Sequence, residues 1–554
     1  MSCVWSRLRS IAQGFSSLTN QSIKTAHNKS IITTTTIQYY YHPPNPVKPS
    51  PDPEPARARP TVTNSAESGP VDRSTSQPSQ PDSDVPVMRA RARQVLTQSS
   101  PVPSTKLGRL AHYTSLLGGL GMGIVKDKFT NSANHPGGGI LSAANGRRLV
   151  DKLSRMRGAA LKVGQFLSIQ DSAVVPDQLR MILEQVQHSA NFMPFDQTNK
   201  VLETNLGKDW PAKFESFELV PFAAASIGQV HQARLHPSAE FPSGLDVAVK
   251  VQFPGVRQSI QSDLTYLSWL LIGSSVLPKG LFLENTIKVM TKELDDECDY
   301  QREAEQAIKM RSLIQNCDLN SSFRVARVIS DLSGAQVLTT ELMAGQSLSG
   351  ASEWDQAERD LIGNSVLNLC LSEVFRFGLM QTDPNTGNFL FDRQSQKLEL
   401  IDFGATREYH QPFINTFYEL LLAAVHQDKP LATRLSQEVG YLTGNEVDIM
   451  IDAHLNSLFA LASPFRADAP EPFNFGQLGP PITDQIRKQI PVMLQNRLTP
   501  PPDQTYSLNR KLSGAFLLCE RLKSNVQTKS LLQRYKPSHT PTPQQSSLIN
   551  QLSG

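Results

Sequence analysis

Residues 382–404 read TDPNTGNFLFDRQSQKLELIDFG, and this stretch decides the fold. Two apolar segments, NFLF and KLELI, flank a polar connection, which predicts a tight β-hairpin. Such a hairpin returns the chain so that Asn388, at its start, and Asp402, at its end, face one site. Their side-chain oxygens are hard ligands of the kind that Mg²⁺ prefers when it bridges phosphates. The sequence therefore predicts a magnesium nucleotide site whose metal ligands are Asn388 and Asp402.

A third acidic residue completes the pattern, because Asp383 lies five residues before Asn388. The order D-x-x-x-x-N followed by D-F-G is that of the protein-kinase catalytic loop and its metal-binding triplet. Asp383 would then orient an attacking hydroxyl or water. A D-F-G triplet alone arises easily by chance, but the catalytic-loop spacing upstream of it favours the functional interpretation.

Lys250 ends the alternating segment DVAVKV, which predicts a β-strand within a strand-rich region from residue 214. A lysine at the end of an apolar strand is often a surface residue. In a kinase lobe it instead contacts the α- and β-phosphates and pairs with a glutamate of a helix. A long, strongly charged helix is expected over roughly residues 285–313. Spacing alone does not choose among its acidic residues, Glu293, Asp295, Asp296, Glu297 and Asp299.

Three features depart from an ordinary protein kinase. Where a glycine-rich loop is expected, the chain reads AAASIG over residues 223–228, which alone would be an ordinary strand turn. Gln381 and Thr382 replace the usual His-Arg before Asp383. After D-F-G, helical periodicity resumes at about Phe413 with no A-P-E motif, so little room remains for an activation segment. These losses favour hydrolysis, or transfer to a small or lipid-like acceptor, over phosphorylation of proteins.

The amino-terminal segment is basic and contains no acidic residue before Asp52. It carries Arg7 and Arg9, and its apolar residues Val4, Leu8, Ile11, Phe15 and Leu18 fall on one helical face. This pattern is typical of a mitochondrial presequence, with a disordered basic tail as the alternative. The five cysteines form no CxxC pair, which indicates a reducing compartment. A net charge of +3 gives no reason to expect a nucleic-acid partner.

A Pro-, Ser- and Thr-rich stretch, residues 43–105, follows and predicts a disordered linker. Residues 113–125 then read YTSLLGGLGMGIV, with Gly119 and Gly123 in GxxxG spacing. This run is shorter than the roughly 18–20 residues that a membrane-spanning helix needs. It is therefore equally compatible with a Gly-rich loop, a segment on the membrane surface, or a span. From about Gly146 the apolar spacing becomes helical, and Lys162 and Gln165 share one face of that helix.

With these residues the chain resembles the UbiB/ADCK family of atypical kinase-like proteins, in its branch of mitochondrial coenzyme Q biosynthesis. KVGQ at residues 162–165 matches the family's KxGQ motif, and AAAS at residues 223–226 matches its alanine-rich loop. Glu297-Cys298-Asp299 matches its ExD motif, and the Asp383, Asn388 and Asp402 set matches its catalytic core. The motifs span about residues 146–407, and the helical carboxy-terminal lobe extends the resemblance to about residue 530.

The resemblance implies roles for particular residues. Glu297 would pair with Lys250, and both would serve catalysis together with Asp383. Residues from three segments would bind the nucleotide: Ala223, Ala224, Ala225 and Ser226 of the loop, Glu341, Leu342 and Met343 of the hinge, and Lys162 and Gln165 of the KxGQ helix. That helix would pack over the nucleotide, where ordinary kinases bind a peptide substrate.

The fold class expected is α+β, an atypical protein-kinase-like bilobal fold with an N-terminal helical KxGQ extension. The expected domains are a presequence at 1–42, a linker at 43–105, and a Gly-rich possible membrane segment at 106–145. The KxGQ extension follows at 146–213, the N-lobe at 214–343, the C-lobe at 344–530, and a flexible tail at 531–554.

The function expected is an atypical kinase or ATPase that binds ATP with Mg²⁺ and supports coenzyme Q biosynthesis. Its expected partners are the biosynthetic proteins, isoprenoid-quinone lipid intermediates and the matrix side of the inner membrane, with a homodimer possible. One alternative is a non-catalytic pseudokinase scaffold, favoured by the missing glycines and the lost His-Arg. Another is a conventional kinase acting on the biosynthetic proteins.

Overall fold

The computed structural model describes residues 114–116, 118–119, 148, 150, 181, 192–273, 282–476 and 481–535. The expected presequence and linker lie outside these residues, as do Lys162, Gln165 and most of the Gly-rich segment. Within the described ranges, no helix is both long enough and apolar enough to cross a membrane.

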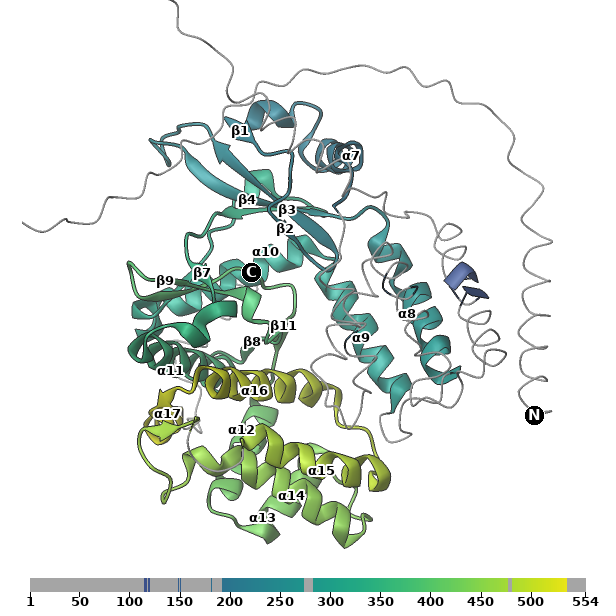
Figure 1. The fold of residues 1–554 in the computed structure, drawn as a ribbon, viewed down its shortest axis with the longest axis vertical. Coiled ribbons are helices and arrows are strands. Elements are labelled where there is room, and N and C mark those ends of the chain that lie inside the picture. Colours follow the sequence, from purple (N-terminus) through teal and green to yellow (C-terminus); the bar gives the residue numbers. More distant parts are fainter. Residues whose placement is uncertain are drawn as a thin grey trace, which may run out of the picture. The chain divides into compact units, whose positions relative to one another are not determined.

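A five-stranded antiparallel sheet forms the N-lobe (Figure 1). Its strands are β1 (Ser216–Phe217), β2 (Ala223–Ala224), β3 (Gly228–Leu235), β4 (Leu245–Gln252) and β6 (Val337–Glu341). They run in the order β1-β3-β4-β6, with β2 paired to β3. Along β4, Val247, Val249 and Val251 are fully buried in the core with α7 (Phe195–Leu206). Because side chains alternate along a strand, Lys250 lies on the opposite face, towards the C-lobe.

Three helices follow β4 in sequence: α8 (Val256–Gly273), α9 (Leu283–Glu297) and α10 (Tyr300–Gln315). The prediction of one helix over about residues 285–313 is therefore wrong, because the helix is interrupted between α9 and α10. Asp299 causes the break: its backbone is non-helical, and its side chain accepts a hydrogen bond from the Arg302 amide as the N-cap of α10. The break turns the two helices independently and decides which acidic residue faces Lys250.

The predicted hairpin of the C-lobe is confirmed. Strand β9 (Phe389–Asp392) pairs antiparallel with β10 (Lys397–Leu400), with Phe389 opposite Leu400. These two strands lie between β5 (Phe323–Val325) and β7 (Gln346–Ser347) in a four-stranded sheet. The amide of Ile401 donates to the carbonyl of Asn388 at 3.4 Å, which brings Asn388 beside the residue that precedes Asp402.

A second, two-stranded ladder flanks the hairpin. It pairs β8 (Leu379–Gln381) with β11 (Thr406–Glu408). Helix α12 then starts at Gln411, close to the predicted restart at about Phe413. The connection between D-F-G and this helix is therefore short, as the sequence predicted.

The rest of the C-lobe is helical (Figure 1). Helix α11 (Gln356–Ser372) continues into a π-helical turn (Glu373–Phe377) before β8. The later helices are α12 (Gln411–Val425), α13 (Lys429–Val439), α14 (Asp448–Ala462), α15 (Ile482–Asn496), α16 (Asp503–Leu522) and α17 (Thr528–Arg534). A small ladder joins β12 (Phe473–Asn474) and β13 (Asn525–Val526). Short 3₁₀ turns occur at Trp210–Lys213, Asp318–Ser321, Ser330–Leu332, Leu348–Glu353, Thr386–Asn388 and Ser463–Phe465.

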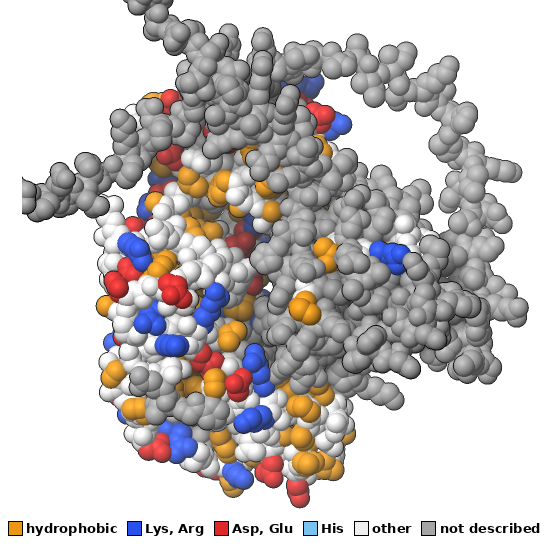
Figure 2. Space-filling view, viewed as in Figure 1, with side chains coloured by type: hydrophobic (Ala, Val, Ile, Leu, Met, Phe, Trp, Pro, Cys, Tyr) orange, Lys and Arg blue, Asp and Glu red, His pale blue; other side chains and the backbone are white. Residues whose placement is uncertain are grey.

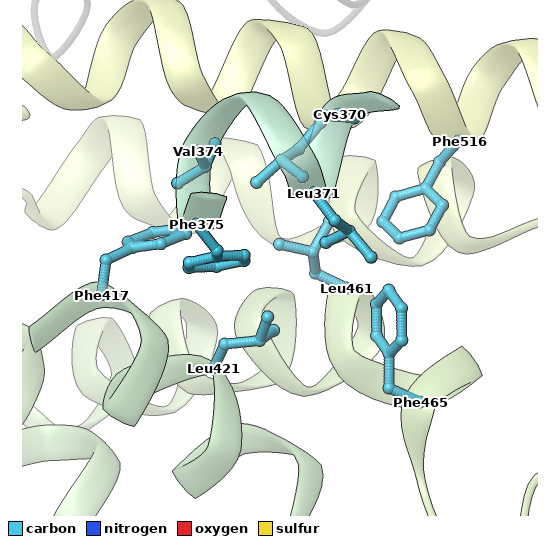
Figure 3. Close-up of a pocket in the computed structure, with 10 residues that line it drawn as sticks. Cys370, Leu371, Val374, Phe375, Phe417, Leu421, Leu461, Phe465 and Phe516 are labelled. Carbon is cyan, nitrogen blue, oxygen red and sulfur yellow. The ribbon is translucent and has the colours of Figure 1, made fainter. Parts of the chain in front are cut away.

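An apolar cavity lies within this helical region, against the π-helical turn (Figure 3). Its wall includes Phe375 of that turn, Phe417 of α12, Phe465 of the 3₁₀ turn at Ser463–Phe465, and Phe516 of α16. The cavity is lined entirely by apolar side chains and Cys370, so it offers nothing to bind a phosphate. On the surface shown in Figure 2, acidic and basic side chains are interspersed over the described C-lobe rather than gathered by sign.

Candidate nucleotide site

Lys250 is held by two carboxylates from different parts of the chain. Its Nζ lies 2.7 and 2.9 Å from the two carboxylate oxygens of Glu303, and 3.2 Å from Oδ2 of Asp402. Glu303 is on α10, and its side chain is 2% exposed. The Lys250 Nζ also lies 5.1 Å from the centre of the buried Tyr300 ring. Strand β4, helix α10 and the D-F-G triplet therefore meet at Lys250.

The prediction that Glu297 pairs with Lys250 is wrong, because the partner is Glu303. Glu297 is the last residue of α9, whereas Glu303 lies in the first turn of α10. Glu297 is buried beside the D-F-G triplet instead, and a Cβ placed on Gly404 would lie 3.5 Å from its Cγ. The sequence signal that could have corrected the choice is Asp299, a residue type favoured at N-caps, immediately before a new helix.

The carboxylates around Lys250 exceed its single positive charge. Burial alone would lower the pKa of Lys250, but Asp402 and Glu303 raise it well above its usual value, so this lysine stays cationic. Burial raises the pKa of Glu303 to about 7 against the opposing charge of Lys250, and the Asp402 and Glu297 carboxylates add to the increase. Among the described residues, Lys250 is the cation that contacts both Glu303 and Asp402, and a bound cation would add to its positive charge.

The catalytic loop is closed by its own side chains. The amide nitrogen Nδ2 of Asn388 donates to Oδ2 of Asp383 at 3.1 Å, and the backbone amide of Asn385 donates to Oδ1 at 3.3 Å. The Asn385 side chain in turn accepts from the Gly387 amide at 3.0 Å. The side-chain nitrogen of Asn388 donates to Asp383. The side-chain oxygen Oδ1 of Asn388 is therefore the atom that could bind a cation.

The D-F-G triplet is fixed from α10. The Gly404 amide donates to Oδ1 of Asp402 at 3.1 Å, and Phe403 is buried in the C-lobe core. Arg302, the neighbour of Glu303, donates to the carbonyls of Gly404, at 3.2 Å, and of Thr406. One turn of α10 thus holds both Lys250 and the triplet. Nothing in the local sequence distinguishes Arg302 from a surface arginine, and sequence reasoning missed it.

The donor set fits Mg²⁺ that arrives with a nucleotide. In the part of the chain that the structure describes, no group of three or more His, Cys, Asp or Glu side chains could hold a metal ion. Asn388 and Asp402 would contribute one oxygen ligand each, or two from a bidentate carboxylate. Mg²⁺ typically completes such a site with phosphate oxygens and water, so a sparse protein ligand set is the expected arrangement.

The alanine-rich segment forms a tight turn at the edge of the N-lobe sheet. Strand β2, Ala223–Ala224, pairs with β3, and the Ala225 amide donates to the Gly228 carbonyl at 2.9 Å. Gly228 allows no side chain, because a Cβ there would lie 2.6 Å from the Val251 carbonyl oxygen and 2.7 Å from the Tyr300 hydroxyl. The nucleotide contacts predicted for Ala223, Ala224, Ala225 and Ser226 stay predictions.

The predicted hinge follows β6. Glu341 is the last residue of that strand, and the Leu342 amide donates to the Asp246 carbonyl at 2.9 Å. Met343 is buried at the start of the connection to the C-lobe. These three residues thus join the two lobes, while their adenine contacts stay predictions.

The chain is similar in sequence to a family of kinase-like proteins. The profile of the ABC1 atypical kinase-like domain matches residues 185–436. The chain is 46% identical over 440 residues to the atypical kinase COQ8, mitochondrial, of Schizosaccharomyces pombe, covering 79% of this chain and 70% of that protein. It is 44% identical over 433 residues to the Saccharomyces cerevisiae protein of the same name, covering 77% and 84%.

Two more distant similarities extend the comparison. The chain is 42% identical over 438 residues to the atypical kinase COQ8B, mitochondrial, of Danio rerio, covering 78% of this chain and 68% of that protein. A solved structure of Rv3197 with erythromycin, from Mycobacterium tuberculosis, aligns with a TM-score of 0.48 and 24% identity, over 75% of this chain and all of that chain. The latter similarity is too low to support an inference.

Proposed function

This chain belongs to the COQ8 group of ABC1 atypical kinase-like proteins, and on that premise we propose that it binds ATP with Mg²⁺ and hydrolyses it in support of coenzyme Q biosynthesis. The observation that carries the proposal is the convergence on Lys250 of Glu303 and Asp402, beside the hairpin that begins at Asn388.

Each residue of the site has a chemical task in this proposal. Lys250 stays cationic and binds the nucleotide phosphates, while Glu303 fixes the direction of its side chain. Asn388 and Asp402 would hold Mg²⁺, which neutralises phosphate charge when bound. Asp383 would orient the attacking hydroxyl or water through one of its carboxylate oxygens. In this structure one of these oxygens accepts from the Asn388 side chain and the other from the Asn385 amide.

Water, or a small or lipid-like acceptor, suits this site better than a peptide. Between Asp402 and α12 the chain makes only the short strand β11, which pairs with β8 directly before the catalytic loop. This connection leaves no long segment against which a peptide could be aligned. Isoprenoid-quinone intermediates and the other biosynthetic proteins are the partners that the family assignment favours.

The proposed location is the mitochondrion, on the matrix side of the inner membrane. The relatives quoted above are named mitochondrial, and the basic, acid-free start of this chain supports a presequence over residues 1–42. The Gly-rich residues 106–145 would then contact the membrane, and the KxGQ extension would cover the nucleotide. Import of a fusion of residues 1–42 to a reporter protein tests the presequence.

Phosphate release by the purified full-length protein tests the activity. We expect Mg²⁺-dependent release from the wild type and a loss of at least tenfold in Asp402→Asn, because one metal ligand loses its charge. Asp452→Asn is the matched control: this carboxylate is exposed and lies 3.7 Å from Lys429. Equal release from the wild type and Asp402→Asn would contradict the proposed activity.

A pseudokinase scaffold is the second candidate. It is supported by the alanine turn in place of a glycine-rich loop and by the capture of both Asp383 oxygens within the loop. Restored coenzyme Q production in cells that carry only Asp383→Asn would favour the scaffold. Phosphorylation of a biosynthetic protein by the wild type, but not by Asp383→Asn, would instead revive a conventional kinase.

A further inference from the structure

We propose that helix α16 positions the catalytic loop, with Arg510 and Lys511 supporting the two residues that precede Asp383. The inference rests on the proposed function, since it concerns how Asp383 is held. Helix α16 follows residue 436, so it lies outside the segment that the ABC1 profile matches. The positioning machinery would then extend beyond that domain.

Two neighbouring residues of α16 donate to the two residues before Asp383. Lys511 Nζ donates to Oε1 of Gln381 at 3.0 Å, and Arg510 Nε donates to the Thr382 carbonyl at 3.4 Å. These are the two positions where the usual His-Arg is replaced. Two cations from a helix more than a hundred residues later in the sequence therefore contact the two positions at which the usual His-Arg is replaced.

One turn further along α16, Gly514 packs against Pro384, the residue after Asp383. A Cβ built on Gly514 would overlap the Pro384 ring. Positions four apart share one face of a helix, so Arg510 and Gly514 present a single surface to the loop. Asp383 is thus flanked on both sides by residues that touch α16.

Arg510 is itself rigidly held. Its two terminal nitrogens each lie 3.1 Å from an oxygen of Glu293 on α9, which also accepts from Ser507 at 2.8 Å. Arg407, beyond D-F-G, lies 3.4 Å from the same carboxylate. Burial would raise the pKa of Glu293, but Arg510 and Arg407 lower it below its usual value, so the ion pair is charged. The network connects α9, α16 and the segment after D-F-G behind Asp383.

Lys511 is anchored as firmly, and its side chain is 2% exposed. It lies 3.4 Å from Oε2 of Glu373, whose other oxygen accepts from the Gln381 backbone amide at 3.2 Å. Glu373 begins the π-helical turn that leads to β8. A misplacement of about 1 Å at a reacting centre costs on the order of 100-fold in rate, so this support has a kinetic consequence.

A simpler explanation is that Arg510 only neutralises the buried Glu293. The two explanations differ for Arg510→Gln combined with Glu293→Gln, which removes both charges at once. Because Glu293→Gln also removes the partner of Arg407, that single variant is the reference. Neutralisation predicts that the double variant turns over at least as fast as Glu293→Gln alone. Positioning predicts that the double variant is slower than Glu293→Gln alone, because it also lacks the hydrogen bond to Thr382.

The experiment measures turnover number and MgATP dissociation constant for full-length variants. Arg510→Gln and the double variant should lose about 10- to 100-fold in turnover number, with the dissociation constant within about twofold of wild type. Gly514→Ala should do the same by displacing Pro384. The matched controls are Arg521→Gln, an exposed contact of α16 with Ser349, and Gly350→Ala, where nothing lies within 4 Å. A double variant that turns over at least as fast as Glu293→Gln alone would overturn the inference.

Hydrogen exchange keeps this test separate from that of the proposed function. If the wild type releases no phosphate, the proposed activity fails, but exchange at the amides of residues 381–388 still reports how the loop is held. We expect the amides there to exchange faster than in the wild type in Arg510→Gln and Gly514→Ala. In Arg521→Gln they should exchange at the wild-type rate. Unchanged exchange in both loop variants would overturn the inference whatever the activity.

Discussion

Lys250 on β4 and Glu303 on α10 form a buried ion pair, with Nζ and Oε1 2.7 Å apart across 53 residues of sequence. Arg302, which directly precedes Glu303 on α10, donates a hydrogen bond to the carbonyl of Gly404 in the D-F-G triplet. The first turn of α10 therefore fixes Lys250 and the D-F-G triplet together. This arrangement needs no long activation segment, which the chain does not have between Asp402 and α12.

A double-mutant cycle identifies the partner of Lys250. We expect a coupling free energy of unfolding for Lys250→Met with Glu303→Gln of about 3 kcal/mol, because breaking a buried pair leaves an uncompensated charge. The same cycle with Glu297→Gln should show a clearly smaller coupling, measured by urea unfolding. A larger coupling to Glu297 would mean that Glu297, and not Glu303, pairs with Lys250.

Arg302→Ala should loosen the D-F-G triplet, since Gly404 and Thr406 lose their common donor. We expect weaker MgATP binding and at least tenfold slower phosphate release, measured by calorimetry and by a phosphate assay. Lys309→Ala on the same helix is the control, because its exposed pair with Glu408 contributes only about 0–1 kcal/mol. Equal effects of the two substitutions would show that Arg302 has no special role.

Gly228→Ala should damage the alanine-rich turn that precedes β3. The new Cβ would lie within 2.6–2.7 Å of the Val251 carbonyl and the Tyr300 hydroxyl, so the backbone must move. We expect a loss of roughly 1–3 kcal/mol in the free energy of unfolding, together with weaker ATP binding. Combining it with Tyr300→Phe should recover part of the loss by removing one of the two clashes, and thermal unfolding of both variants checks this.

Acid should destabilise the protein through two buried histidines. Burial lowers the pKa of His231 and of His454 to about 4, against an ordinary value of 6.5. The unfolded chain therefore takes up protons below pH 6.5 that the folded chain refuses, so stability is lost as the pH falls from 6.5 towards 4. The loss is about 3 kcal/mol per histidine.

Unfolding free energies at pH 7.5 and 5 test this origin. His454→Gln should shrink the difference between the two values, because one of the two titrating groups is gone. His231 is held by a hydrogen bond between Nδ1 and the Glu218 carbonyl at 2.8 Å, so the same substitution there costs stability at both values. An unchanged difference in His454→Gln would assign the acid sensitivity to other groups.

Local patterns predicted much of this site correctly. The alternation of DVAVKV placed Lys250 on a strand, and the apolar segments on either side of residues 393–396 predicted the hairpin that brings Asn388 near Asp402. The return to helical spacing after D-F-G predicted the short connection to α12. Each of these depends on side chains a few residues apart, where period and turn chemistry decide the outcome.

The contacts that could not be predicted from the sequence depend on long-range geometry. The choice of Glu303 over Glu297 follows from a helix break at Asp299, which reorients every acidic residue beyond it. Arg510 and Lys511 reach the catalytic loop from a helix that reads as an ordinary amphipathic helix. Their partners, Thr382 and Gln381, lie 128 and 130 residues away. No periodicity in a single chain reports such contacts.

The central claim is that Asn388 and Asp402 hold Mg²⁺ with ATP, and the most direct measurement is ATP binding as a function of Mg²⁺ concentration. Wild type, Asp402→Asn, Asn388→Ala and the surface control Asp452→Asn should be titrated side by side by calorimetry. The account predicts that the first two variants need at least tenfold more Mg²⁺ than the wild type and the control to reach half-maximal binding. The same Mg²⁺ dependence in all four proteins would contradict it.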